Sequence, residues 1–302
     1  MTAADRYATP AAFRRALTDR LRTMAGDSPW TLPQLQRHVA YDRLLERLYS
    51  LDGDWVVKGA TALMARDLGT RGTLDIDVYR EMSLADAEAD LRHAAAVDIG
   101  DWFRFEIRTA APVGNVGVRL PITSVIGSTT WAGFHVDLIG SGLRMTGQPE
   151  HVPPLARDAI PEVAQHGYEA YPLVDHVADK VAATYERYGA ADMPSTRYRD
   201  LIDLVSIVTG ASVSAADQVA ALLSEFDRRQ LDLPQAFDAP DRNLWEAGYA
   251  AEARRSLLVT GRTLAEALAL VKPFIDPLLN GTATGDWNPQ SQQWAPRQGT
   301  AC

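Results

Sequence analysis

Six residues in the first third of the chain constrain its fold more than any other stretch. Between Thr73 and Val78, side chains that carry a hydroxyl or a carboxylate alternate with apolar ones. A period of two is typical of a β-strand, whose successive side chains point to opposite faces. We therefore predict one strand face that packs against a helical layer and one that presents polar groups. The apolar positions are Leu74, Ile76 and Val78, and the polar ones are Thr73, Asp75 and Asp77.

The two carboxylates in this row indicate a cation site. Neighbouring carboxylates repel unless a cation neutralises them, and two oxygen ligands together with substrate phosphates suit Mg²⁺. Asp75 and Asp77 are thus candidate metal ligands. An Asp-x-Asp pair on a solvated strand edge has the same spacing, so the surrounding sequence has to decide between the two interpretations.

The segment before the pair favours the functional interpretation. A buried strand is predicted over Trp55–Val57, it ends at Gly59, and a short helix is predicted over 61–66. A glycine turn between a strand and a helix lets backbone N–H groups approach a phosphate. A strand, a glycine turn, a helix and a second strand with Asp-x-Asp together indicate a nucleotide-binding site.

The remaining sequence divides into a mixed first half and a helical second half. Apolar periodicity and capping residues predict the elements, and a Pro-containing stretch over 147–159 predicts the boundary. The residues after 279 lack apolar periodicity and are expected to form a disordered tail. The predicted domains are 1–150 with the sheet, 151–279 with helices that complete the site, and the tail 280–302. The predicted helices are 10–21, 32–51, 83–95, 173–188, 196–209, 215–228, 243–251 and 264–276, and the further strands are 103–108, 116–120 and 134–138.

Composition excludes several classes of protein. The only cysteine is Cys302, so no internal disulfide framework and no cysteine-based metal site can form. The six histidines lack zinc-binding spacing, and neither a nucleophile-elbow nor a Walker A motif occurs. No apolar run is long enough to span a bilayer, and no signal peptide is recognisable, so we expect no membrane association and a cytoplasmic location. The net charge of −9 argues against a general nucleic-acid coating protein. A chain with this net charge can nevertheless present local basic faces.

The glycine turn and the Asp-x-Asp strand match the pattern of the polymerase-β-like nucleotidyltransferases, with a departure at Ala60, where Gly or Ser is usual. More specifically, residues 57–63 (VKGATAL) and 71–77 (RGTLDID) resemble the AbiEii/AbiGii toxin family, which includes the MenT toxins. A second block of that family is matched in the helical half by 179–183 (DKVAA) and 197–204 (RYRDLIDL). The resemblance extends over roughly residues 30 to 210.

This resemblance implies an α+β fold, in which a polymerase-β-like mixed sheet flanked by helices precedes a mainly helical C-terminal domain. It also implies roles for single residues. Asp75 and Asp77 would bind Mg²⁺, or alternatively Mn²⁺, on the phosphates of a nucleoside triphosphate (NTP), and Asp137 would be a third metal ligand on a later strand. Lys180 would neutralise phosphate charge, and Asp203 would orient the acceptor, act as a base or position Lys180. Nucleotide contacts are expected from Lys58, Gly59, Thr61 and Thr73.

Several of these residues also have structural interpretations. Lys58 could pair with Asp75 or Asp77 rather than reach a phosphate. Asp200 shares a helix face with Asp203, and an ion pair with a nearby arginine is the preferred interpretation for it. The sequence favours Asp203 as the functional acid of the two.

The resemblance implies that a nucleoside monophosphate is transferred from an NTP to RNA, most specifically to the 3′ end of tRNA, which would block aminoacylation and growth. It also implies a cognate antitoxin. Clustered arginines could bind RNA phosphates or could form solvated helix faces. Two alternatives are transfer to a protein or small-molecule hydroxyl, and a catalytically silent binding module. Sensitivity to RNase separates the first from transfer to RNA, and an Asp75→Ala variant with unchanged biological effect would favour the second.

Overall fold

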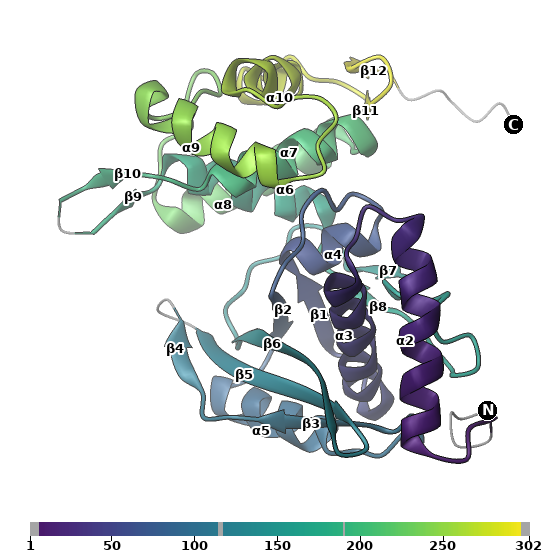
Figure 1. Ribbon diagram of the computed structural model, residues 1–302. Coiled ribbons are helices and arrows are strands. Elements are labelled where there is room, and N and C mark those ends of the chain that lie inside the picture. The colour runs from purple at the N-terminus through teal and green to yellow at the C-terminus, as the bar shows by residue number, and fades with distance from the viewer. Residues whose placement is uncertain (1–5, 114–116, 190, 297–302) are drawn as a thin grey trace, which may run out of the picture. The chain divides into compact units, whose positions relative to one another are not determined.

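The computed structural model describes residues 6–113, 117–189 and 191–296, and the chain separates into two compact units (Figure 1). Unit 1 comprises Met1–Arg66, Gly72–Leu143 and Pro149–Ala170, and unit 2 comprises Asp67–Arg71, Arg144–Gln148 and Tyr171–Cys302. The predicted boundary at 150 is therefore too early. The residues up to Ala170 belong to unit 1 because two short strands from this segment extend its sheet.

Unit 1 is built on an eight-stranded mixed sheet with the order β3-β5-β6-β2-β1-β8-β7, in which β4 pairs with β5. The central strand β2 is parallel to β6 and antiparallel to β1. This mixed sheet, flanked by helices, confirms the predicted fold class. Its strands are β1 (Trp55–Lys58), β2 (Asp75–Arg80), β3 (Phe103–Ile107), β4 (Ala111–Val113), β5 (Gly117–Ile126), β6 (Thr129–Ile139), β7 (Glu150–Val152) and β8 (Tyr168–Ala170).

The described part of unit 1 contains four helices near their predicted positions, although α2 continues to Gly26. α2 and α3 lie side by side against the sheet (Figure 1). Capping explains these starts. Thr31 forms a capping box with Gln34, and the Ser83 side chain accepts a hydrogen bond from the backbone N–H of Asp86. The helices are α2 (Pro10–Gly26), α3 (Leu32–Leu51), α4 (Gly59–Ala65) and α5 (Leu84–Ala95).

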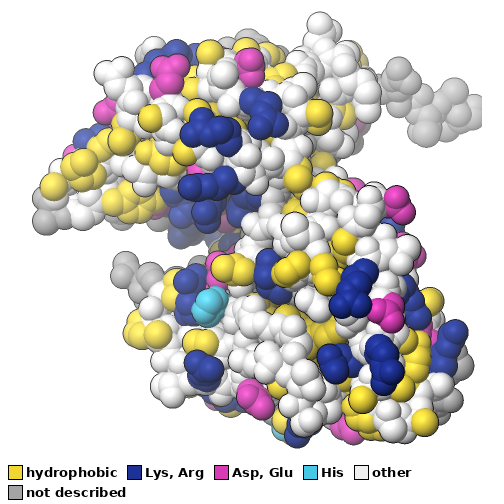
Figure 2. Space-filling model, in the orientation of Figure 1, with side chains coloured by type: hydrophobic (Ala, Val, Ile, Leu, Met, Phe, Trp, Pro, Cys, Tyr) yellow, Lys and Arg dark blue, Asp and Glu magenta, His cyan; other side chains and the backbone are white. Residues whose placement is uncertain are grey.

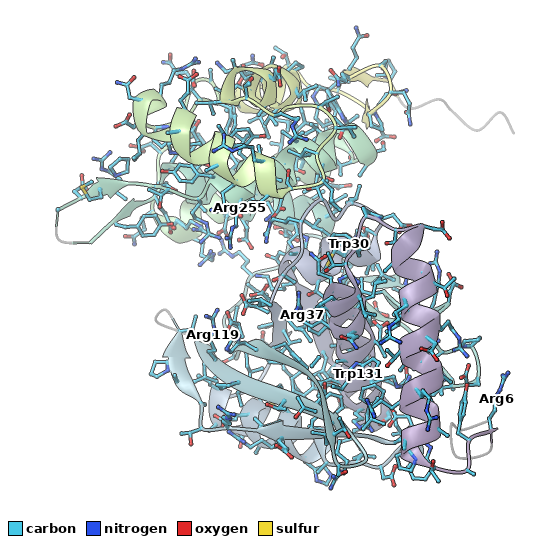
Figure 3. All side chains as sticks on the ribbon, in the orientation of Figure 1. Arg6, Trp30, Arg37, Arg119, Trp131 and Arg255 are labelled. Carbon is cyan, nitrogen blue, oxygen red and sulfur yellow. The ribbon has the colours of Figure 1, made fainter. Side chains whose placement is uncertain are left out.

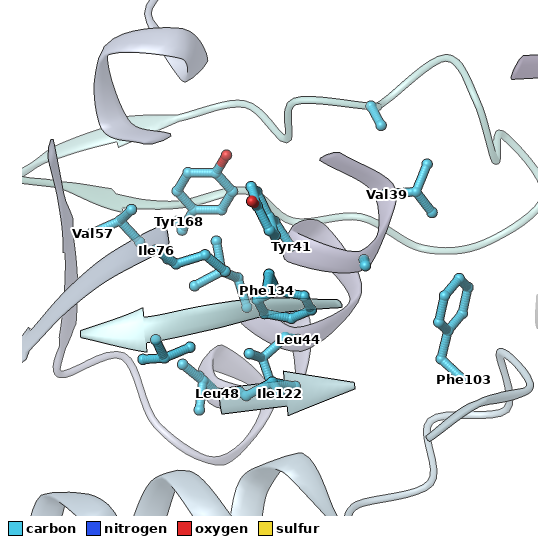
Figure 4. Packing of buried hydrophobic residues seen from close by; sticks show 14 of the residues in the cluster. Val39, Tyr41, Leu44, Leu48, Val57, Ile76, Phe103, Ile122, Phe134 and Tyr168 are labelled. Atoms are coloured by element: carbon cyan, nitrogen blue, oxygen red, sulfur yellow. The ribbon is translucent and has the colours of Figure 1, made fainter. Parts of the chain in front are cut away.

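The core of unit 1 lies between these helices and one face of the sheet (Figure 4). Ile76 and Val78 are fully buried, as their alternation predicts. Leu74 is an exception, since it is 53% exposed. The reason is that β2 begins only at Asp75, so Leu74 and Thr73 precede the strand. The prediction that Thr73 lies on this strand is therefore wrong.

Unit 2 is mainly helical, as predicted. Two short hairpins accompany its helices: β9 (Arg187–Tyr188) with β10 (Met193–Pro194), and β11 (Asp286–Asn288) with β12 (Gln293–Ala295). None of the helices in the described parts of the chain is long and apolar enough to cross a bilayer. The helices of unit 2 are α6 (Leu173–Tyr185), α7 (Tyr198–Gly210), α8 (Ala215–Arg229), α9 (Arg242–Arg255) and α10 (Leu264–Leu279).

The second hairpin corrects the prediction of a disordered tail. Trp287 is 1% exposed, and its indole N–H donates to the Val208 carbonyl at 2.7 Å. Trp294 donates to the Phe274 carbonyl at 3.0 Å, and its ring lies against those of Phe274 and Trp287. Aromatic burial thus orders the residues up to 296 without any periodic apolar pattern, while 297–302 lie outside the described residues.

Candidate active site

Strand register places four charged residues in one row across the sheet of unit 1. Lys58 on β1 lies opposite Asp77 on β2, Asp77 lies opposite Asp137 on β6, and Asp137 lies opposite Arg119 on β5. Two residues earlier on β2, Asp75 lies opposite His135 of β6. The sheet therefore brings the three predicted carboxylates together on the face opposite the core.

Asp77 lies directly against Gly59, the first residue of α4. A Cβ atom on Gly59 would be 1.9 Å from Oδ2 of Asp77, and Gly59 has a φ of +62°, which a side chain would strain. Glycine is thus required twice at this turn, for its backbone conformation and for the space that the carboxylate fills. The glycine of the sequence motif has a role within the protein whether or not a nucleotide is bound.

Asp75 is accessible and is surrounded by two nitrogen-bearing side chains. One third of its side chain is exposed, its Oδ1 lies 3.4 Å from Nδ1 of His135, and it lies 3.7 Å from Nη2 of Arg119. Asp137 is more enclosed, with 14% of its side chain exposed. Both of its oxygens accept hydrogen bonds from Arg119, from Nε and from Nη2, each at 2.7 Å. Figure 3 shows Arg119 projecting from β5.

The two threonines differ from their predicted roles. Thr61 is fully buried, and its hydroxyl donates to the backbone carbonyl of Asp75 at 3.3 Å. The Thr73 hydroxyl accepts a hydrogen bond from the Asp75 backbone N–H at 3.1 Å, which forms a turn just before β2. Both hydroxyls therefore fix the backbone of Asp75 at the start of β2. The contacts of Thr61 favour this structural role over contact with a nucleotide.

A small hollow lies beside Asp75 on the same face of the sheet. Its volume is about 210 Å³, and its walls include the exposed Leu74, Thr123, Gly133 and His135. A Cβ atom added to Gly133 would meet no other atom within 4 Å. The hollow is thus an open space beside His135, the neighbour of Asp75, and it is bordered by apolar and hydrogen-bonding groups.

The donor set of Asp75 and Asp77 fits a divalent cation such as Mg²⁺, which is commonly held by one or two carboxylates while water and phosphate oxygens complete the coordination. Asp137 is less suited to a cation than these two carboxylates, because Arg119 donates a hydrogen bond to each of its oxygens. Within the described residues, no group of three or more His, Cys, Asp or Glu side chains is arranged to hold a metal. A cation site here therefore relies on the two carboxylates of β2.

The functional residues predicted in the helical half form a separate network within unit 2. The Lys180 ammonium on α6 donates to Asp203 at 2.7 Å and to Asp200 at 3.1 Å, both on α7. Arg71 donates to both oxygens of Asp203, at 3.0 and 2.9 Å. Arg197 pairs with Asp200, as the structural interpretation of that residue predicted. Asp203 thus pairs with Arg71, Asp200 pairs with Arg197, and both acids accept a hydrogen bond from Lys180.

This network fixes the charge of its members. Burial would raise the pKa of Asp203, but the charges and hydrogen bonds of Lys180 and Arg71 outweigh it and lower that pKa to about 2. Burial would lower the pKa of Lys180, but the charges of Asp203 and Asp200 raise it above its ordinary value. A carboxylate with such a low pKa is a weak base. The geometry thus favours Asp203 as a residue that positions Lys180.

The exposed arginines of unit 2 are largely paired with acids. Arg199 and Arg255 both contact Glu252, and Arg187 contacts Asp192. Figure 2 shows basic side chains interspersed with apolar and acidic ones on both units. These pairs support the interpretation of the arginine clusters as solvated helix faces, and an RNA phosphate would have to compete with the acids.

Comparison with known proteins identifies the family. A family model for the AbiEii nucleotidyl transferase toxin of type IV toxin–antitoxin systems matches residues 43–270, well over half of the chain. The chain belongs to the AbiEii nucleotidyl transferase toxin family. The resemblance of the two sequence blocks is thereby confirmed, and the protein is a nucleotidyltransferase.

One solved structure supports the fold of this chain. MenT4, a nucleotidyltransferase toxin of Mycobacterium tuberculosis H37Rv, is 16% identical with a TM-score of 0.51, over 84% of this chain and 99% of that one. JHP933 from Helicobacter pylori is 13% identical with a TM-score of 0.46, over 85% and 94% of the two chains. No curated protein matches the sequence.

Sequence reasoning missed two arginines of this AbiEii protein that pair with predicted site acids. Arg71 lies within a family motif that does not indicate its partner, and no local pattern singles out Arg119. Arg119 is identified only by strand register, because it precedes Asp137 by 18 residues and lies opposite it on the neighbouring strand. Arg71 stands 132 residues before its partner Asp203. Neither distance along the chain follows from a local pattern.

Proposed function

We propose that this AbiEii protein transfers a nucleoside monophosphate from an NTP to the 3′ end of tRNA, which blocks aminoacylation and growth. The observation that carries the proposal is the Asp75–Asp77 pair, held on one strand face with Asp77 against the glycine turn. An acceptor hydroxyl attacks the α-phosphorus, the bond from the α-phosphorus to the bridging oxygen breaks, pyrophosphate leaves, and the hydroxyl proton passes to solvent.

Asp75 and Asp77 would hold Mg²⁺, with Mn²⁺ as an alternative. When bound, the ion would neutralise phosphate charge and orient the reacting groups. Lys58, which lies opposite Asp77 on β1, would face the same phosphates, and the backbone at Gly59 would lie beside them. Thr73 would act through the turn that it forms before Asp75. The roles of these residues rest on their placement around the carboxylate pair.

Lys180 would supply a positive charge to the phosphates in the transition state, with Asp203 as its positioning residue. An ammonium group has three N–H donors, and two of them are used by Asp203 and Asp200. The third would donate to a phosphate oxygen.

The first test is transfer of label from each NTP in turn to purified total tRNA in the presence of Mg²⁺. Periodate-oxidised tRNA, which lacks the terminal vicinal hydroxyls, is the matched control. Label in intact tRNA alone is expected. Label in both preparations would contradict transfer to the 3′ end. Label that enters protein or a small molecule of a lysate, but not tRNA, would contradict an RNA acceptor and favour the alternative acceptors.

Replacing Lys180 by methionine should reduce transfer by about 10²-fold, the order expected when one charge-stabilising donor is lost. Folding should be largely retained, because Asp203 keeps Arg71 and Asp200 keeps Arg197. Initial rates and a thermal melt of the same preparation measure the two effects. The control is Lys272→Met, which removes a lysine of unit 2 that pairs with Asp238 instead. Equal activity of the two variants would contradict the role of Lys180.

The hollow beside Asp75 provides a test of where a substrate lies. Gly133→Val adds a β-branched side chain that is compatible with a β-strand and whose Cβ atom would have no other atom within 4 Å, so the fold should be unchanged. If the acceptor or the nucleotide occupies the hollow, its KM should rise by about 10-fold, since a clash of this kind costs roughly 1–3 kcal/mol. Gly53→Val, equally open before β1, is the control. Unchanged KM values for both substrates would place them elsewhere.

The family implies an antitoxin, and we propose that a cognate antitoxin relieves growth arrest by this protein. A cytoplasmic location follows from the proposed tRNA acceptor. Co-expression of the neighbouring gene product with the toxin should restore growth. Arrest that persists in the presence of every neighbouring product would contradict this partner.

A further inference from the structure

The carboxylate cluster of unit 1 already contains a fixed positive charge. Arg119 donates two parallel hydrogen bonds of 2.7 Å to the two oxygens of Asp137. A bidentate arginine–carboxylate pair is among the stronger and geometrically more specific ion pairs. The pair also joins adjacent strands in register, so both backbones hold it in place.

The guanidinium of Arg119 interacts with all three carboxylates rather than with Asp137 alone. Its Nη2 lies 3.7 Å from Oδ1 of Asp75. The hydrogen bonds and charge of Asp137, followed by the charges of Asp75 and Asp77, raise the pKa of Arg119 above its ordinary value against a smaller opposing effect of burial. The side chain of Arg119 is nevertheless 40% exposed, so a substrate can reach its remaining N–H groups.

A second metal ion would need the carboxylate that Arg119 holds. In two-metal transfer, each ion stabilises one of the two oxygens of the displacement, the attacking or the leaving one. Here the oxygens of Asp137 are engaged, which leaves the two carboxylates of β2 as metal ligands.

We propose that Arg119 takes the place of a second metal ion, so that the site combines one divalent cation on Asp75 and Asp77 with a guanidinium held by Asp137. Arg119 then donates hydrogen bonds to a non-bridging oxygen of the phosphate under attack, and Asp137 is a positioning residue. This inference rests on the proposed nucleotidyl transfer. It concerns only how the second positive charge is supplied.

The test counts Mn²⁺ ions bound to the full chain in the presence of a non-hydrolysable α,β-methylene NTP analogue, by equilibrium dialysis and the electron paramagnetic resonance signal of free Mn²⁺. One ion per chain is expected for the wild type and for Asp137→Asn. Arg119→Gln, which frees Asp137, is expected to bind a second ion. Arg104→Gln, which removes an arginine from β3, is the control and should bind one.

Activity provides a second readout. Arg119→Gln should lose about 10²-fold in rate, and Arg119→Lys should recover part of that loss because it restores the positive charge. Two ions on the wild type and one on Asp137→Asn would overturn the inference and leave nucleotidyl transfer intact. Analogue that binds without any Mn²⁺ would contradict the metal dependence proposed above together with the inference. A thermal melt verifies that each variant is folded.

Discussion

Asp101→Ala should destabilise unit 1 by about 3–5 kcal/mol, the cost of leaving buried charges without their partner. Asp101 lies between two arginines of α3 and is 0% exposed. Arg47 donates to both of its oxygens at 2.6 and 2.9 Å, and Arg43 donates at 2.7 Å. Both guanidinium groups are themselves buried. Without the carboxylate, two positive charges would stay in the interior with backbone carbonyls and, for Arg47, the ring of Phe105 as partners.

Urea denaturation followed by tryptophan fluorescence measures this loss. Because the chain has two units, the unfolding of unit 1 should separate from that of unit 2 in the variant, and a single transition can no longer be assumed. Asp54→Ala removes an exposed carboxylate of the same unit and should change stability by less than about 0.5 kcal/mol. Equal denaturation midpoints for the two variants would contradict the prediction.

The same group predicts the direction of the pH dependence. Burial would raise the pKa of Asp101, but hydrogen bonds and charge from Arg47 and Arg43 outweigh it, and the pKa is lowered. A lowered pKa in the folded state means that the unfolded state binds the proton more readily. The contribution of Asp101 is therefore complete above its unfolded pKa of roughly 4 and is lost as the pH falls through the folded value. Acidification should destabilise the wild type more than Asp101→Ala.

The elements of this fold follow from its sequence where the signals are local. The alternation at Ile76 and Val78 predicts the buried face of β2, and the capping residues Thr31 and Ser83 predict where helices begin. Local signals fail where contacts with residues distant along the chain determine whether a segment is ordered. Trp287 is ordered by contact with α7 and α10. Its own neighbours carry no periodic pattern, and the sequence therefore predicts disorder there.

In the candidate site, too, some residues are predictable from local sequence and others depend on partners that are distant along the chain. Asp75 and Asp77 are two residues apart, so a single strand places them together and the sequence predicts the pair. The partner of Asp137 is different, because Arg119 reaches it through the register of two long strands. Spacing along the chain cannot distinguish a carboxylate that binds metal from one that binds an arginine. The neighbouring strand determines the partner, and here it places Arg119 against Asp137.

Asp77→Ala should reduce nucleotidyl transfer by about 10³- to 10⁴-fold, since a metal ligand contributes several kcal/mol of transition-state stabilisation. Gly59→Ala should cause a loss of similar order for a reason that the structure supplies. Its methyl group would occupy the position of the Asp77 carboxylate, 1.9 Å from Oδ2. The carboxylate would have to leave its place, and the φ of +62° would add strain of about 1–2 kcal/mol.

These two variants should act through one contact, and a double-mutant cycle tests that. Once Asp77 is alanine, the methyl group of Gly59→Ala has no carboxylate to displace, so the second substitution should cost little further activity. Sites that share a contact show such non-additivity, whereas independent sites add. Gly53→Ala, at an open position without a positive φ, should leave the rate unchanged. Losses that multiply in the double variant would show that Gly59 serves the nucleotide directly and not through Asp77. Rates measured with tRNA and labelled NTP, with a thermal melt of each variant, decide between the two roles.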